Sequence, residues 1–132
     1  MAGGPTIFTR IIRGEVPAHR LYEDERTFAF LDIRPIREGH TLVVPKAEVD
    51  VLWDLDRADY DAVFSTAYRL APAISRAAAA QRCGVIAAGF EVPHAHVHVI
   101  PADTMEDLDF RRGRPAADAD LAAVAQRIRA AL

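Results

Sequence analysis

Apolar residues recur with a helical period in three stretches of the chain. Residues 7–12 carry apolar side chains at helical spacing, and Gly14 ends this short segment. The same spacing over 56–80 predicts one long helix that is kinked near Pro72. An apolar stripe over 121–132 predicts a final helix. The chain is therefore expected to have a short, a long and a C-terminal helix.

Five other stretches are short, apolar or β-branched, and bounded by turn residues, which is typical of strands. They are residues 20–24, 27–33, 40–44, 84–88 and 95–100. The first two are joined by a polar turn and predict a hairpin. Strands that follow one another, with helices between and after them, predict an α+β fold.

Length and composition narrow the class of protein. At 132 residues the chain fits one domain, spanning 1–132, with a polar loop at 102–119. A formal charge of −3 argues against a nucleic-acid partner. The single cysteine, Cys83, excludes an internal disulfide, and no stretch is apolar enough for a membrane span or a signal peptide. A cytoplasmic protein with no membrane partner is expected.

Three histidines occupy alternate positions near the last predicted strand. His94, His96 and His98 should therefore project from one face, opposite the intervening apolar residues. Such an array is compatible with a structural role, with a metal site, or with phosphoryl chemistry in which one neutral imidazole attacks phosphorus and its neighbours donate hydrogen bonds.

The metal alternative is limited by geometry. With a rise of about 3.3 Å per residue the outer Cα atoms are about 13 Å apart, whereas Zn–N bonds are about 2.0–2.1 Å. A three-histidine cage on an extended strand is therefore disfavoured. Two of the histidines together with Glu91 or Glu48 remain a conceivable ligand set. Phosphoryl chemistry uses all three rings, and we predict no bound metal and no cofactor.

The segment 92–101, VPHAHVHVIP, resembles the H-φ-H-φ-H-φ-φ signature of the histidine triad (HIT) family, in which φ is apolar. Three further blocks look like family blocks in the expected order: 7–17, 30–33 and 39–46. The resemblance therefore covers about residues 6–101, and it points to the Hint-like branch of the family.

The resemblance implies a five-stranded antiparallel sheet with helices, a homodimer, and a purine nucleotide substrate. It makes His96 the nucleophile on the α-phosphate, with His98 and His94 contacting phosphate oxygens or orienting the nucleophile. Asp32 would bind the ribose hydroxyls, as suits a carboxylate facing paired donors. The remaining residues expected to contact substrate are Ile7, Phe8, Ile11, Phe30 and Ile33 as walls of the nucleobase site, with Glu91 and Val92 beside the phosphate.

The sequence departs from the family pattern beside the triad. Gly89 is followed by Phe90 and Glu91, where members commonly carry Gln and then Ser or Thr, and residues 83–88 contain no asparagine. An ionised Glu91 would repel an anionic leaving group, so it is expected to act as a protonated acid, to select a cationic leaving group, or to lower activity.

The positions of the zinc ligands found in one subset of the family hold Thr6, Thr9 and Glu48, so no structural zinc is predicted. We interpret Glu48 as a solvated charge at a strand end. His40 is expected to be structural, and Trp53 to pack beneath the loop before the long helix.

Three functions follow from these features. The first is a nucleotide phosphoramidase, hydrolase or nucleotidyl transferase that works through a covalent nucleotidyl-histidine intermediate. The second is a regulatory nucleotide-binding module with little turnover, and the third is a metal-binding protein that uses part of the triad.

Overall fold

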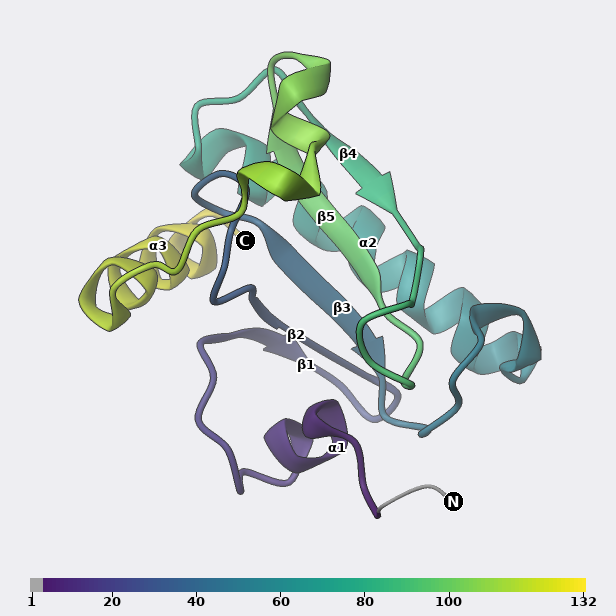
Figure 1. Ribbon diagram of the computed structural model, residues 1–132. Coiled ribbons are helices and arrows are strands. Elements are labelled where there is room, and N and C mark those ends of the chain that lie inside the picture. Colours follow the sequence, from purple (N-terminus) through teal and green to yellow (C-terminus); the bar gives the residue numbers. More distant parts are fainter. Residues whose placement is uncertain (1–3) are drawn as a thin grey trace.

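The computed structural model describes residues 4–132 as an α+β fold, as the sequence predicts (Figure 1). The strands are β1 (Arg20–Glu23), β2 (Thr27–Leu31), β3 (Thr41–Pro45), β4 (Arg82–Ile86) and β5 (Val97–Ala102). They form one antiparallel sheet in the order β1-β2-β3-β5-β4. The helices are α1 (Ile7–Ile12), α2 (Arg57–Ala77) and α3 (Asp118–Ala131), with 3-10 turns η1 (Leu52–Asp54), η2 (Met105–Leu108) and η3 (Phe110–Arg112).

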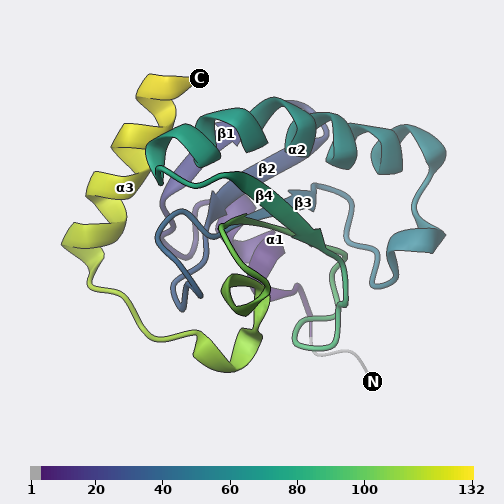
Figure 2. The same ribbon diagram turned by 90° about the horizontal axis from the view of Figure 1, so that it is seen from above.

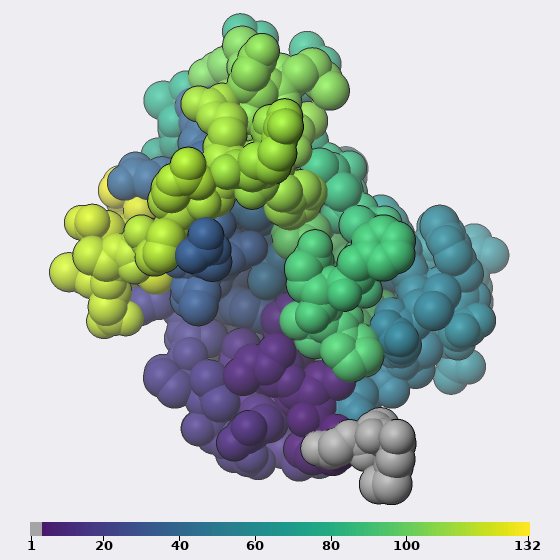
Figure 3. All heavy atoms as spheres, viewed as in Figure 1, coloured from purple at the N-terminus to yellow at the C-terminus, as the bar shows by residue number. Residues whose placement is uncertain are grey.

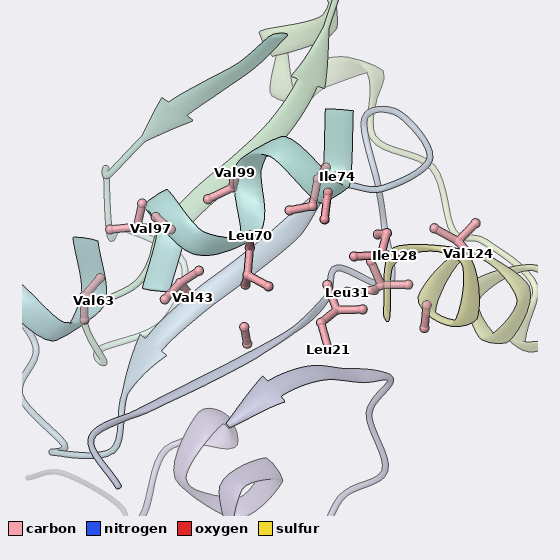
Figure 4. Packing of buried hydrophobic residues seen from close by; sticks show 14 of the residues in the cluster. Leu21, Leu31, Val43, Val63, Leu70, Ile74, Val97, Val99, Val124 and Ile128 are labelled. Atoms are coloured by element: carbon pink, nitrogen blue, oxygen red, sulfur yellow. The ribbon is translucent and has the colours of Figure 1, made fainter. Parts of the chain in front are cut away.

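The sheet separates two layers of different size. Figure 2 shows α2 and α3 on one face and the short α1 on the other. The larger core lies under α2 and α3, where Leu70 and Ile74 of α2 pack on Val43, Val97 and Val99 of the central strands (Figure 4). Full burial of each such side chain contributes roughly 1.5–3 kcal/mol, so this layer supplies most of the stabilisation.

The smaller core lies between α1 and the opposite face of the sheet. Phe8 of α1 packs there with Phe28 and Phe30 of β2 and with Leu42 and Val44 of β3. The β2 and β3 residues alternate in sequence, so one face of each strand serves this core while the other face serves the α2 side. Because α1 covers only part of this face, the rest of it is open to form a site.

Two strands begin away from the predicted position. β4 is displaced by two residues, to 82–86, and β5 runs over 97–102, so His94 and His96 lie on the segment that leads into β5. The expected burial of Trp53 is wrong, because its side chain is 74% exposed and contacts Tyr60 at the surface. Its place within the short turn η1 directs the ring outward rather than under the loop.

The predicted loop at 102–119 contains η2 and η3 and is tied to the rest of the chain. The Arg37 guanidinium binds Asp103 at 2.8 Å and Asp107 at 3.1 Å. Further along, the Ala116 amide donates to the Ile33 carbonyl at 3.1 Å. A Cβ on Gly113 would lie 2.9 Å from the Arg34 carbonyl oxygen, so glycine permits this close approach. These contacts bring η3 to the open face of the sheet.

Within residues 4–132, no helix is both long enough and apolar enough to cross a membrane.

Candidate active site

An open cavity of about 510 Å³ lies on the face of the sheet that α1 only partly covers. Figure 3 shows this face hollowed between α1, the strands β2 and β3, the segment before β5, and the C-terminal segment that contains η3. Ten of the eleven residues expected to take part in catalysis or binding line this cavity, and the exception is His94. The ten are Ile7, Phe8, Ile11, Phe30, Asp32, Ile33, Glu91, Val92, His96 and His98.

The alternating histidines lie on the α1 side of the sheet, as their spacing predicts. Ala95 and Val97 belong to the core under α2, whereas His96 and His98 face the cavity. All three triad rings are buried, with residue exposures of 0% for His94, 3% for His96 and 5% for His98. Each buried ring therefore needs hydrogen-bond partners, and these partners fix where its protons lie.

The His96 ring is oriented by the backbone of its own segment. Its Nδ1 lies 2.7 Å from the His94 carbonyl oxygen, which can only accept, so Nδ1 carries a proton and donates it. In the neutral ring Nε2 then holds a free lone pair. The Phe8 ring stands edge-on to His96 at 5.1 Å and restricts its rotation. His96 thus presents an unprotonated nitrogen as a potential nucleophile.

His40, which the sequence indicated as structural, belongs to the site. The Ile36 amide donates to His40 Nδ1 at 3.1 Å, so in the neutral ring the proton lies on Nε2. His40 Nε2 is 2.9 Å from His98 Nδ1 and donates to it. The remaining proton of a neutral His98 then lies on Nε2, which is buried without a hydrogen-bond partner among the described residues.

Burial keeps both of these rings neutral. It lowers the pKa of His40 to about 4, and it lowers the pKa of His98 to about 4 with help from neighbouring histidines. Phe110 of η3 contributes to this burial by standing edge-on to His98 at 4.7 Å. The arrangement leaves one N–H donor, on His98, that needs an acceptor such as a phosphate oxygen.

His94 lies behind the cavity rather than on its surface. Its Nε2 donates to the Pro45 carbonyl oxygen at 2.8 Å, and its Nδ1 is 2.8 Å from the Thr6 hydroxyl. Burial lowers the pKa of His94. Both ring nitrogens are therefore engaged with protein atoms, and this position suits orientation of His96 rather than contact with phosphate.

Asp32 borders the cavity at the end of β2, beside the apolar wall. One carboxylate oxygen accepts the Arg34 amide at 2.8 Å, and the other lies 3.6 Å from His40 Nε2. The wall itself is uneven: Phe8 and Phe30 are buried, whereas Ile33 is 66% exposed at the rim. An apolar slot with a carboxylate at one end can take a planar base and a hydroxylated sugar.

Glu91 is beside the candidate nucleophile. A carboxylate oxygen lies 3.5 Å from His96 Nε2, while 61% of the side chain is exposed to solvent. A phosphate group at His96 would meet this negative charge, and the exposure of Glu91 leaves its side chain free to turn away. Its neighbour Phe90 is 93% exposed and does not border this cavity.

Sequence reasoning missed three contributors to the site. His40 and Phe110 contact His98, and Glu48, expected to be merely solvated, accepts hydrogen bonds from Thr6 and Thr9. His40 lies beside His98 because Leu42 pairs with His98 in the sheet and His40, two residues before Leu42, shares its face. That pairing is not visible in the sequence.

Comparison with known proteins agrees with this geometry. The family model described as "HIT domain" matches residues 13–105, so the chain belongs to the HIT family. It is similar to adenosine 5'-monophosphoramidase HNT1 of Saccharomyces cerevisiae, with 39% identity over 72% of this chain and 61% of that protein. It is also similar to adenylylsulfatase HINT3 of Arabidopsis thaliana, with 33% identity over 72% of this chain and 51% of that protein.

Among solved structures, a HIT-like protein from Bartonella henselae, described as involved in cell-cycle regulation, is similar over the whole of both chains. The identity is 33% and the TM-score is 0.87. This likeness includes the C-terminal segment beyond residue 105, which the family model does not reach. Hint-like proteins are thus among the relatives of this chain.

Proposed function

We propose that this protein hydrolyses or transfers a purine nucleoside monophosphate by attack of His96 on the α-phosphate. The observation that carries the proposal is the complementary protonation of two adjacent rings. His96 presents a free Nε2 lone pair, and His98 presents an unpartnered Nε2–H. A nucleophile beside a donor is what phosphoryl transfer requires.

The groups that take part in the proposed reaction face the cavity or contact His96. The base lies along Phe8 and Phe30, and the ribose hydroxyls donate to Asp32. His98 Nε2–H donates to a phosphate oxygen. As His96 Nε2 bonds to phosphorus, the bond from phosphorus to the leaving group breaks. The leaving group departs with that electron pair and takes up a proton from solvent, and the His96 ring becomes positive. The His94 carbonyl, which accepts the hydrogen bond from Nδ1–H, stabilises that charge. Water then attacks phosphorus and gives its proton to solvent, while the P–N bond breaks and its electron pair returns to Nε2, which releases the nucleoside monophosphate.

The metal-binding alternative is weakened by the same protons. Nitrogen and oxygen atoms of Glu91, His96 and His98 lie within 4.8 Å of one another and could hold an ion. A metal would need the lone pair of His98 Nε2, which would move the remaining proton to Nδ1 and toward His40. His40 Nε2 would then have to accept from His98 Nδ1–H, which in a neutral ring places the His40 proton on Nδ1. His40 Nδ1, however, already accepts a hydrogen bond from the Ile36 amide. No neutral tautomer of His40 satisfies both bonds.

Glu91 is the residue that supports the alternative function, a regulatory nucleotide-binding module. Its charge near His96 could reduce turnover and leave a module that binds nucleotide without cleaving it. The proposal of an enzyme is favoured by the 61% exposure of the side chain, which permits it to leave the phosphate site. The relatives named as an adenosine 5'-monophosphoramidase and an adenylylsulfatase support the same choice.

Intact-protein mass spectrometry tests the covalent step. The wild type and His96→Gly are mixed with adenosine 5'-phosphoramidate and quenched rapidly without acid, because the expected N–P bond is acid-labile. An added nucleotidyl mass on the wild type alone, with AMP appearing over time, is the expected result. AMP binding by calorimetry without adduct or hydrolysis would refute the enzyme and favour the binding module.

We also propose that the protein forms a homodimer through β4 and α2. β4 ends the sheet and pairs only with β5 among the described strands, and Val85 is 50% exposed on it. Tyr68 of the adjacent α2 is 85% exposed. An unprotected edge strand beside an exposed aromatic residue suits a second copy. Sedimentation equilibrium should show a dimer that Val85→Lys dissociates, and a monomeric wild type would refute this.

A further inference from the structure

A hydrogen-bonded cluster joins α1, the loop after β3 and the first histidine of the triad. The Glu48 carboxylate accepts the Thr6 amide at 3.0 Å and the Thr9 hydroxyl at 2.6 Å through the same oxygen. The Thr6 hydroxyl in turn accepts the Thr9 amide at 3.1 Å and lies 2.8 Å from His94 Nδ1. Three segments that are distant in sequence thus meet behind the cavity.

The proton positions in this cluster follow from its ends. His94 Nε2–H donates to the Pro45 carbonyl, so Nδ1 of the neutral ring can only accept. The Thr6 hydroxyl must therefore donate its proton to His94. Thr9 gives its own hydroxyl proton to Glu48, so Thr9 does not compete for His94 Nδ1, from which it is 3.5 Å away. Glu48, as the acceptor of the Thr9 hydroxyl proton, therefore leaves the Thr6 hydroxyl as the donor to His94 Nδ1.

The cluster matters because α1 is too short to be stable alone. A six-residue helix lies far below the length at which isolated helices form in water, so its position depends on tertiary anchors. Phe8 of this helix contacts the rings of His94 and His96, at 5.6 and 5.1 Å. The same helix provides Ile7 and Ile11 to the cavity wall. Any displacement of α1 therefore alters both the nucleoside wall and the packing of the candidate nucleophile.

We propose that Glu48 is a positioning residue, whose carboxylate anchors α1 against His94 and thereby sets the nucleoside wall and the orientation of His96. The proposal rests on the proposed function for the identity of the ligand. Glu48 touches neither the cavity nor His96, and it acts through Thr6, Thr9 and His94. The role differs from that of a solvated charge, because the interaction requires an acceptor at this position rather than a negative charge.

Nucleotide affinity and the mobility of α1 test the proposal in the full chain. Glu48→Ala removes the acceptor, and we expect AMP binding to weaken about tenfold and the amides of α1 to exchange about tenfold faster, since a lost hydrogen bond changes such equilibria by about this factor. The melting temperature should change little, because the larger core lies on the other face of the sheet. Glu25→Ala, at an exposed glutamate in the β1–β2 turn, is the matched control.

Glu48→Gln separates positioning from simple charge. Its amide oxygen can still accept from Thr6 and Thr9, so AMP affinity and α1 exchange should return to nearly wild-type values. The proposal is overturned if Glu48→Ala binds AMP as the wild type does with unchanged exchange, or if Glu48→Gln is as impaired as Glu48→Ala. These readouts are independent of turnover, so a wild type that binds AMP without forming the His96 adduct would refute the proposed reaction and leave the anchoring test intact.

Discussion

Lowering the pH from 7 to 5 should destabilise this protein through histidines that are buried as neutral rings, of which His40 and His98 have the largest pKa shifts. His40 and His98 are 1% and 5% exposed, and burial lowers the pKa of each from 6.5 to about 4. The unfolded chain binds protons at these groups as the pH falls below 6.5, whereas the folded chain does not until about pH 4. Stability is therefore full above pH 6.5, declines as the pH falls, and levels off below pH 4. At pH 5 each ring costs about 2 kcal/mol relative to pH 7, or about 4 kcal/mol for the pair.

Urea unfolding at pH 7, 6 and 5 measures this loss. His40→Gln replaces the ring with an amide that can still donate to His98 but cannot titrate. The variant should lose about 2 kcal/mol less than the wild type over this range. His19→Gln, at a half-buried histidine beside Asp118, is the comparison variant. Hydrogen-bonded carboxylates such as Asp24, whose pKa is lowered, titrate at more acidic pH and do not contribute between pH 7 and 5. Equal pH-dependent losses in the wild type and His40→Gln would refute the reasoning.

Three further changes probe the cavity. Glu91→Ser should raise turnover of anionic leaving groups relative to amines by about fivefold, since a unit charge about 4 Å away in a watery setting is worth about 1 kcal/mol; an unchanged ratio of kcat/KM values removes Glu91 from leaving-group selection. Phe110→Ala exposes His98 and should raise its pKa from about 4 in an NMR titration, and a pKa that stays there would contradict the desolvating role of the ring. Asp32→Asn should weaken AMP binding by about tenfold or more but leave 2',3'-dideoxy-AMP nearly unaffected, and equal losses for both would argue against a ribose contact.

The fold and part of the site could be predicted because they depend on local periodicity. Alternation over 94–98 places the three histidines on one face, and the apolar spacing of 7–12 predicts the helix that walls the cavity. The contacts of His40 with His98 and of Glu48 with Thr6 span 58 and 42 residues. Such contacts depend on strand pairing and on the docking of α1. A single sequence specifies neither of these directly.

The predicted bounds of β4 and β5 were wrong because strand ends also depend on contacts between distant segments. Ala87 and Ala88 are apolar and extend the predicted fourth strand, but the pairing of β4 with β5 ends at Ile86. The backbone amides of His94 and Ala95 donate to the carbonyls of Val92 and Val49 rather than to a neighbouring strand. The segment before β5 is thus not paired with a neighbouring strand. Its backbone carbonyl at His94 is therefore not used in strand pairing and can accept a hydrogen bond from His96 Nδ1.

Backbone groups rather than charged neighbours assign the protons at this site. The Ile36 amide, the Pro45 carbonyl and the His94 carbonyl each bind one ring nitrogen, on His40, His94 and His96. Backbone groups do not titrate, so they impose the same tautomers over the whole pH range in which the rings stay neutral. The chemistry of the site therefore depends on how accurately the sheet and the segment before β5 are held. This dependence explains why an exposed residue such as Glu48, which anchors the covering helix, can influence a nucleophile that it does not touch.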